Sequence, residues 1–430
     1  MYFGLMIAIF VIGYAMIALE HPLKINKSAT AVLLAAVIWA VFALMGPSNP
    51  QEFGLIHHLG ETAEILFFLL GAMTIVEIID KHDGFSIITD KITTTNKRKL
   101  LWIISILTFF MSAVLDNLTT SIVMCALLRK LVADQKTRWF FAGMVILAAN
   151  AGGACSPIGD VTTIMLWIKE NITAGNVILQ TFVPSLVSLL VPVAIIGFTM
   201  KGKLERPEKV ESAESTSVTR KQSLLILCMG VGLLLFVPVF KTITHLPPYL
   251  GILFGLGILW ITTEIMHKNN PENYSRLNVT TIIQKVDVPS VLFFLGILMA
   301  VSCLNEAGHL GKLAGALDKL ENVYVINLVI GVLSSIIDNV PLVAAAMGMY
   351  PIEAMGAFAQ DGAFWEGLAY CAATGGSLLI IGSAAGVAVM GMEKIDFIWY
   401  LKKITLWALI GYLAGAGTFY LMSTLIFHAA

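Results

Sequence analysis

The chain has 430 residues, of which 57% are hydrophobic and only 13% are charged, and its formal net charge is -1. A soluble protein usually carries about 25% charged residues, so this composition, with a mean hydropathy of +0.84, excludes an ordinary soluble protein. Apolar runs of 17 or more residues recur along the chain and predict an all-α polytopic membrane protein. We expect no enzymatic activity, no cofactor and no nucleic-acid partner.

Taken from the N-terminus, the long apolar runs give about ten full membrane spans. The first has no basic start and no small-residue cleavage site, so we expect it to be a retained span rather than a signal peptide. The spans are expected at 2–19, 28–46, 62–79, 139–168, 177–200, 222–240, 248–266, 287–304, 364–390 and 404–427.

Two further pairs of apolar runs, 99–129 and 323–350, are each interrupted by an Asp-Asn pair, at 116–117 and at 338–339. Each arm has about 10–16 residues, which is short for a crossing and suits a re-entrant segment. We therefore predict two re-entrant hairpins, each with a polar tip inside the bilayer.

The run from Trp139 to Ile168 is too long for one straight crossing, because its thirty residues would reach ~45 Å as a helix, against a hydrocarbon core of ~30 Å. Its centre reads NAGGACSPIGDVTT over 150–163, where Gly and Pro favour a break and Asp160 follows at once. A carboxylate beside unwound backbone in mid-membrane is costly unless it holds a cation or a proton. We predict broken transmembrane helices here and, in the second half, at 364–390.

The basic residues gather in alternate loops of this arrangement. If both termini are external, the positive-inside rule is well satisfied, and we expect a multi-pass protein of the bacterial inner membrane. In that orientation 23 of the 27 Lys and Arg fall in the cytoplasmic loops 20–27, 80–99, 129–138, 201–221, 267–286 and 391–403.

The two halves of the chain resemble each other. The Asp-Asn pair at 116–117 recurs 222 positions later at 338–339, and the Gly-Gly pair at 152–153 recurs 223 positions later at 375–376. Each unit holds three spans, an odd number, so the second enters the membrane from the opposite face and the site is expected at the midplane of inverted-topology repeats. The expected organisation is two N-terminal helices (1–60), repeat 1 (61–200), a cytoplasmic loop with two linking helices (201–286) and repeat 2 (287–430).

The first hairpin tip and the first helix break offer hard oxygen donors, which a small cation needs in place of its hydration shell. Two carboxylates near one site, Asp116 and Asp160, also make a proton acceptor, so a cation and protons would compete there. The alternative is that these carboxylates only shape the helix breaks. The expected ion-binding and proton-coupling residues are Asp116, Asn117, Asn150, Ser156, Asp160, Thr162, Thr163 and Glu64, with Na+ at Asp116, Asn117, Asp160 and Thr162.

The second half lacks some of these groups, because Ser383 stands where the first half has Asp160 and Ala373 stands where it has Asn150. We expect the second half to complete the coordination or to move against the first. Its expected contributors are Ser334, Asp338, Asn339, Thr374 and Ser377.

Several charged residues have two interpretations. Asp338 is a contributor to the site or a cap of its own hairpin through side-chain to backbone bonds. Glu61 and Glu64 precede an apolar run, and each is a functional acid or an ordinary residue of the membrane interface. His57 and His58 read as an external loop, with a pH sensor as the alternative.

Four motifs together resemble the NhaD-type sodium/proton antiporters of the ion transporter superfamily. The similarity covers nearly the whole chain. It implies that Na+ or Li+ leaves the cytoplasm in exchange for external H+ by alternating access, with activity at alkaline pH, in a homodimer. The motifs are FFLLGAMTIVEIID (67–80), SAVLDNLTTSIVM (112–124), NAGGACSPIGDVTT (150–163) and SSIIDNVPLVAAAMGMY (334–350).

The same resemblance implies which positions are functional. The essential glutamate of the family falls on Glu61 or Glu64, and Thr374 stands where a Ser is expected. The other positions are Asp116, Asn117, Asn150, Asp160, Thr162, Thr163, Ser334, Asn339 and Ser377.

A sodium-coupled di- or tricarboxylate symporter of the same superfamily is the alternative function. The resemblance implies that such symporters carry neutral Ser-Asn-Thr tips that receive an anion. Here both tips begin with Asp, which would repel one. An arsenite exporter, an intramembrane aspartyl protease and a passive channel are less well supported by the motifs.

Overall fold

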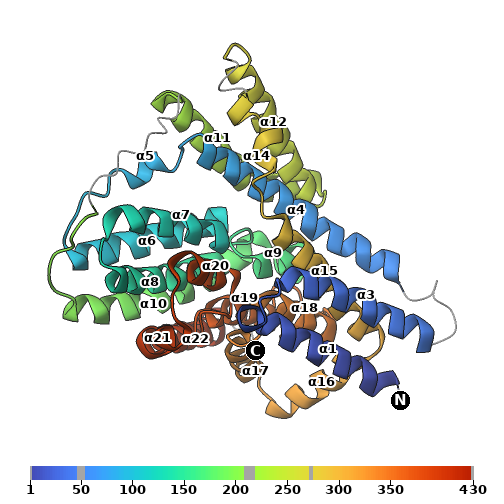
Figure 1. Cartoon of the computed structure of the whole chain (residues 1–430). Coiled ribbons are helices and arrows are strands. Elements are labelled where there is room, and N and C mark those ends of the chain that lie inside the picture. The colour runs from blue at the N-terminus through green and yellow to red at the C-terminus, as the bar shows by residue number, and fades with distance from the viewer. Residues whose placement is uncertain (1, 46–53, 208–217, 271–274, 428–430) are drawn as a thin grey trace.

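The computed structural model describes residues 2–45, 54–207, 218–270 and 275–427, and within these ranges the regular elements are helices (Figure 1). This arrangement confirms the predicted all-α class. In chain order the helices are α1 (Tyr2–Ala18), α2 (Glu20–Leu23), α3 (Lys27–Met45), α4 (Leu55–Lys81), α5 (Ser86–Thr89), α6 (Lys97–Leu115), α7 (Asn117–Leu131), α8 (Gln135–Ala154), α9 (Val161–Ile168), α10 (Ala174–Thr199), α11 (Arg220–Thr244), α12 (Pro248–His267), α14 (Val279–Ile283), α15 (Val288–Glu306), α16 (His309–Leu317), the 3-10 turn η2 (Asp318–Leu320), α17 (Val323–Ser334), α18 (Asn339–Met349), α19 (Ala363–Gly375), α20 (Ala384–Glu393), α21 (Phe397–Lys403) and α22 (Thr405–Leu425).

Eight of the described helices are long and apolar enough to cross a membrane. Seven of them coincide with expected spans, namely α3, α4, α10, α11, α12, α15 and α22. The eighth is α6, whose 19 residues exceed the 10–16 expected for a hairpin arm. That expected length is therefore wrong for α6, because the helix also includes the basic residues 97–99, which belong to the expected cytoplasmic loop 80–99.

Both predicted hairpins turn at their Asp-Asn pair. Asp116 ends α6 and caps α7 with a left-handed backbone (φ 77°), and its side chain accepts a hydrogen bond from the backbone N–H of Thr119. Asp338 caps α18 with an ordinary negative φ of -45°, and its side chain accepts a hydrogen bond from the backbone N–H of Val340. A short acceptor side chain at such a turn satisfies N–H groups that the new helix leaves unpaired.

Both predicted helix breaks are also present. The run 139–168 is divided into α8 and α9 by residues 155–160, and the run 364–390 into α19 and α20 by residues 376–383. A Cβ at Gly152 would lie 2.1 Å from the carbonyl oxygen of Phe109 in α6, and one at Gly375 would lie 2.0 Å from that of Gly331 in α17. Glycine at these positions therefore lets each hairpin lie directly against its broken helix.

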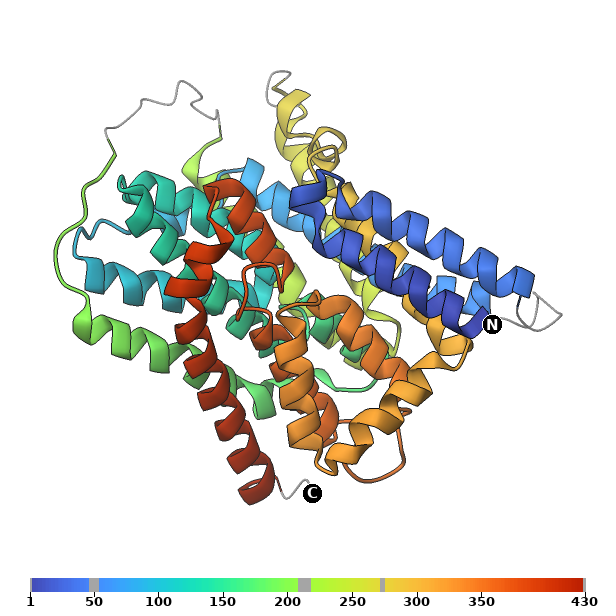
Figure 2. The same cartoon turned by 60° about the horizontal axis from the view of Figure 1, so that its bottom comes forward.

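The two halves interlock. Helix α3 of the first half packs on α15 of the second, α12 packs on α4, and α10 packs on α22. Figure 1 shows α6, α7, α8 and α10 together on one side of the molecule and α1, α3, α15 and α18 on the other, and Figure 2 shows α1 and α3 running side by side. The broken helices and the hairpin tips meet between these two groups.

Candidate functional site

Asp160 lies at the centre of the contacts that join the two halves. It caps the N-terminus of α9 and is 1% exposed. Its Oδ1 accepts hydrogen bonds of 2.8 Å from both the backbone N–H and the hydroxyl of Thr162. The hydroxyl of Thr163 donates to the Asp160 carbonyl at 2.9 Å. The local sequence Asp-Val-Thr-Thr thus fixes the carboxylate at the point where the helix restarts.

The tips of both hairpins reach this carboxylate. The side-chain amide of Asn117 donates to Asp160 Oδ2 at 2.5 Å, and that of Asn339 lies 3.3 and 3.4 Å from its two oxygens. All three side chains are buried. Asp160 is therefore shared by the first hairpin, the first broken helix and the second hairpin.

Asn150 extends the network to the second helix break. Its Oδ1 accepts from Asn117 at 3.0 Å, and its Nδ2 donates to the hydroxyls of Ser377 at 2.9 Å and Ser383 at 3.0 Å. Ser383 caps α20 just as Asp160 caps α9. Four helix N-termini, those of α7, α9, α18 and α20, consequently converge here, and their dipoles favour negative charge.

Asp116 points in a different direction from its neighbour Asn117. Its two carboxylate oxygens accept from the backbone N–H and the hydroxyl of Thr119, each at 2.8 Å. Beside it lies a cavity of about 20 Å³ between α4, α6, α9 and α11, and Asp116 is the one polar residue in its lining. Among the described residues, Asp116 forms no ion pair.

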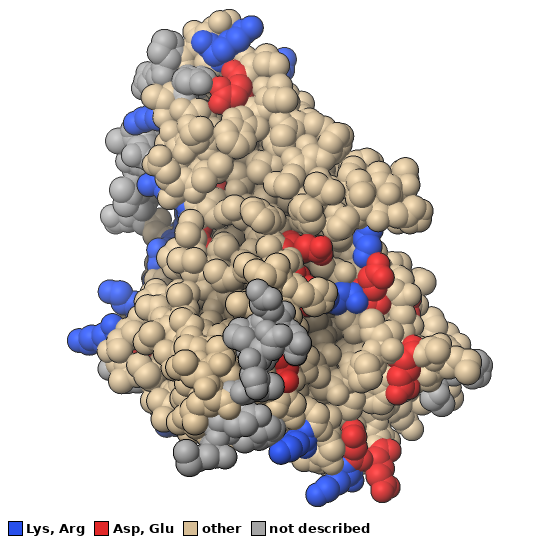
Figure 3. Space-filling view, turned by 90° about the vertical axis from the view of Figure 1, so that its right-hand side faces the viewer, with Lys and Arg blue, Asp and Glu red and all other residues tan. Residues whose placement is uncertain are grey.

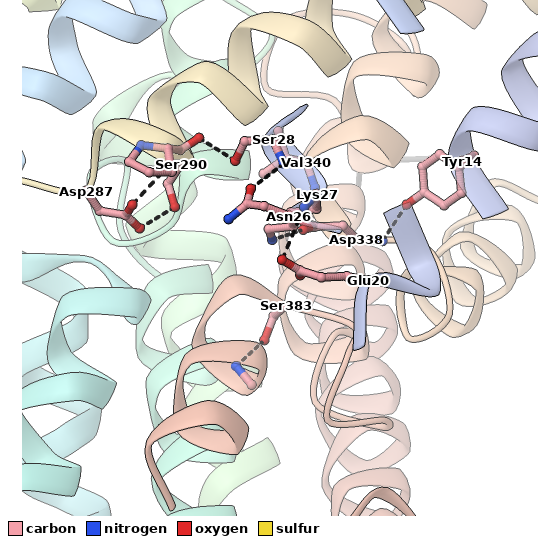
Figure 4. Close-up of polar contacts among 12 residues, drawn as sticks. Tyr14, Glu20, Asn26, Lys27, Ser28, Asp287, Ser290, Asp338, Val340 and Ser383 are labelled. Atoms are coloured by element: carbon pink, nitrogen blue, oxygen red, sulfur yellow. Dashed lines mark hydrogen bonds and ion pairs between the residues drawn. The ribbon is translucent and has the colours of Figure 1, made fainter. Parts of the chain in front are cut away.

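Among the described residues, Asp338 forms no hydrogen bond to Asp160, and its surroundings are charged (Figure 4). Its Oδ2 is 3.4 Å from the ammonium of Lys27, and its backbone N–H donates to the hydroxyl of Tyr14 at 2.8 Å. Neither partner is predictable from the sequence, because Lys27 lies in an expected cytoplasmic loop and Tyr14 in the first expected span, both far from Asp338 along the chain.

The remaining predicted hydroxyl residues hold the backbone around the site. Ser334 donates to Ala372 O at 2.7 Å, and Thr374 donates to Tyr370 O at 2.6 Å. Ser156 accepts from the backbone N–H of Ile158 inside the first break. Within the described structure, these three side chains form no hydrogen bond to Asp160.

Glu61 and Glu64 also lie apart from Asp160. Glu61 forms an ion pair with Lys169 and faces His58, whose Nε2 is 2.8 Å from Glu306 Oε1. These residues line a cavity of about 410 Å³ that also touches α9 and α18, the helices that begin at the site. Figure 3 shows acidic and basic side chains gathered near a hollow on one face of the molecule. Glu64 is close enough to Lys241 for their charges to interact.

Residues 14–366 match the family model described as citrate transporter. Sodium/proton antiporter 1 of Arabidopsis thaliana is 49% identical over 427 residues, which cover 98% of this chain and 73% of that protein. Sodium/proton antiporter 2 of the same plant is 46% identical, over 96% of this chain and 98% of that protein. The Na+/H+ antiporter NhaD of Vibrio cholerae is 32% identical, over 92% of this chain and 86% of that protein.

The citrate-transporter model covers both hairpins and the first break, and the similarity to the two Arabidopsis antiporters covers nearly the whole chain. The chain belongs to the NhaD-type sodium/proton antiporters of the ion transporter superfamily, within the sequences that the citrate-transporter model describes.

Proposed function

We propose that this protein is a secondary transporter that exchanges cytoplasmic Na+ or Li+ for external H+ by alternating access. One observation carries the proposal: Asp160 is a buried carboxylate bonded by amides from both hairpin tips, and among the described residues it has no cationic partner. A buried carboxylate without a cation is costly. A transported cation or proton would supply the missing positive charge.

The proposed Na+ ligands are Asp116, Asn117, Asp160 and Thr162. Oxygen atoms from carboxylate, amide and hydroxyl groups suit a small hard cation. Of these four residues, Asp116 alone lines the cavity of about 20 Å³, which is large enough for one water-sized particle, whereas Asn117 and Thr162 meet at Asp160. In this scheme Na+ and protons compete for the two carboxylates, and Asn150, Ser377 and Asn339 hold the surrounding amides and hydroxyls in place.

The cavity beside Glu61 is the proposed route to the external side. It extends from charged residues of α4 and α15 to Met165 in α9 and Ala344 in α18. In Figure 3 most of the visible Lys and Arg lie along one edge of the molecule, while most Asp and Glu lie toward the middle and the other edge. Under the positive-inside rule, this asymmetry supports a fixed orientation in the membrane. We propose that the membrane is a bacterial inner membrane and that both termini are external. We also propose a homodimer.

The name of the family model makes citrate transport the second candidate. Four converging helix N-termini would suit an anion. In this chain, however, each of these N-termini is already capped by its own side chain, and the carboxylate of Asp160 accepts the N–H of Thr162 in α9 together with the hairpin amides. An anionic substrate would have to bind beside that charge, so cation exchange is the better supported function.

The test uses energised inverted vesicles with a fluorescent probe of the pH gradient. Adding Na+ or Li+ should dissipate the gradient, most strongly at alkaline pH. Asp116→Asn and Asp160→Asn should each reduce the response at least tenfold. Asp134→Asn is the matched control, since Asp134 caps α8 away from the site and Asn caps a helix equally well. A response to citrate or succinate and none to Na+ or Li+ would instead favour the symporter.

A further inference from the structure

We infer that Lys27 acts as a built-in cation that neutralises Asp338 and so restricts the transported cation to the carboxylates of the first half. This inference rests on the proposed exchange function. It assigns to Lys27 a positioning role, because the residue acts on the ion through Asp338.

The contact joins two separate parts of the fold. Lys27 is the first residue of α3, and Asp338 forms the tip of the second hairpin (Figure 4). Their side chains are 16% and 8% exposed, and the Nζ to Oδ2 distance is 3.4 Å. The ammonium also lies 4.4 Å from the ring centroid of Phe293 in α15, a favourable cation–π contact. A Lys at a helix N-terminus gains nothing from the helix dipole, so its stabilisation comes from these partners.

Among the residues that the structure describes, the counterpart of this contact in the first half has no cation. Asp116 and Asp338 occupy equivalent tips, 222 positions apart, and each faces a small cavity. The cavity beside Asp338, about 30 Å³, is lined by Lys27, Glu20 and Tyr14 together with apolar residues. The cavity beside Asp116 is otherwise apolar. The two repeats therefore differ in which tip already has a positive charge.

The charged groups around Asp338 leave Lys27 as its one cationic partner in the described structure. Tyr14 of α1 accepts a hydrogen bond from the backbone N–H of Asp338. Glu20 of α2 lines the same cavity, and its Oε1 accepts from the backbone N–H of Lys27. On the other side of Asp338, Asn339 connects it to Asp160 of α9. Without the ammonium, Asp338 would be a third uncompensated carboxylate, one residue from the Asn339 that bonds to Asp160, and it would attract a cation of its own.

The test compares Lys27→Met, Asp338→Asn, the double variant and Lys27→Arg. The apparent Na+ KM and the maximal rate are measured in vesicles at alkaline pH, where protons compete least. Na+ dissociation constants are measured by calorimetry on the purified full-length proteins. Lys27→Met should lower the Na+ KM roughly three- to tenfold and slow the maximal rate, because the site becomes more negative. Asp338→Asn should raise the KM by a similar factor, because Lys27 is then unpaired.

The double variant restores the charge balance, so its Na+ KM should return to within about twofold of the parent value, and Lys27→Arg should stay there too. A purely structural contact would slow transport in both single variants without moving their KM values in opposite directions, and that result would overturn the inference. If Lys27→Met fails to reach the membrane, Asp338→Asn and the double variant decide the question by themselves. A parent protein that does not respond to Na+ would instead refute the proposed exchange function.

Discussion

At the scale of single residues, three buried or half-buried acids at the hairpin tips and the first break have three different environments. Asp160 accepts hydrogen bonds from two hairpins, Asp116 faces an apolar cavity, and Asp338 pairs with Lys27. The sequence predicted all three as candidates from the same reasoning about polar groups inside apolar runs. It could not separate them, because each partner lies on another helix.

A residue-scale prediction concerns His82, which follows the last residue of α4. Its Nε2 is 3.0 Å from the Nε2 of buried His267 in α12, and its Nδ1 bonds to Ile78 O. Burial lowers the pKa of His82 to about 4, a net shift that the bond to Ile78 O opposes and the neighbouring His267 assists. In the unfolded chain His82 is protonated below about pH 6.5, whereas in the folded protein it stays neutral down to about pH 4.

The stability that neutral His82 provides is therefore complete above pH 6.5 and is lost as the pH falls toward 4, by on the order of 2–3 kcal/mol. In detergent, the melting temperature of His82→Gln should fall less steeply with acidification than that of the parent. His57→Gln is the control, because His57 is 74% exposed, and it should keep the parent slope. A parent slope in His82→Gln would contradict the assignment.

At the scale of helices, the breaks and hairpin turns follow from local sequence. Gly divides two apolar runs that are too long for one crossing, with Pro157 added in the first of them, and Asp-Asn pairs divide two others. The length of α6 was underestimated because a helix can continue past the apolar core into basic residues. An ion-pair cluster also joins three helices: Glu393, the last residue of α20, pairs with Arg129 of α7 at 2.6 Å and with Arg138 of α8 at 2.7 Å.

An element-scale prediction tests the second break. A Cβ at Gly382 would lie 2.7 Å from Ser335 Cα and 2.8 Å from the backbone oxygens of Ser334 and Gly376. Because backbone cannot move aside easily, Gly382→Ala should destabilise the protein by about 1–3 kcal/mol and lower its melting temperature. Gly417→Ala in α22 meets nothing within 4 Å and should be neutral or stabilising by up to about 1 kcal/mol. Equal melting temperatures for the two variants would contradict this view of the break.

At the scale of the whole molecule, helices of each half pack against helices of the other. The division into repeats at 61–200 and 287–430 stays a prediction. Helices α1 and α3 form a packed pair, and α11 and α12 form another. The first pair contacts α15 through α3, and the second pair contacts α4 through α12. We propose that each repeated unit begins with one of these helix pairs. In that case α11 and α12, which were expected to link the two repeats, belong to the second unit.

The membrane orientation gives a prediction at this scale. Lys201 lies in the loop assigned to the cytoplasm, and Met355, 83% exposed, lies in a loop assigned to the outside. Single cysteines at these positions are introduced into a Cys228→Ser background, because Cys228 is the exposed native cysteine and the other four are buried. An impermeant maleimide should label Met355→Cys in intact cells and Lys201→Cys only after the membrane is opened. The reverse pattern would invert the topology.

The sequence by itself determined the class of fold, most of the spans, both hairpins, both breaks and the family. These features depend on hydrophobic length, on Gly and Pro, and on motifs whose residues are neighbours in the chain. Only the tertiary structure decided which acid is central and which is neutralised. The bonds from Asn339 to Asp160 and from Lys27 to Asp338 join residues 179 and 311 positions apart, and such contacts form only when packed helices bring distant segments together.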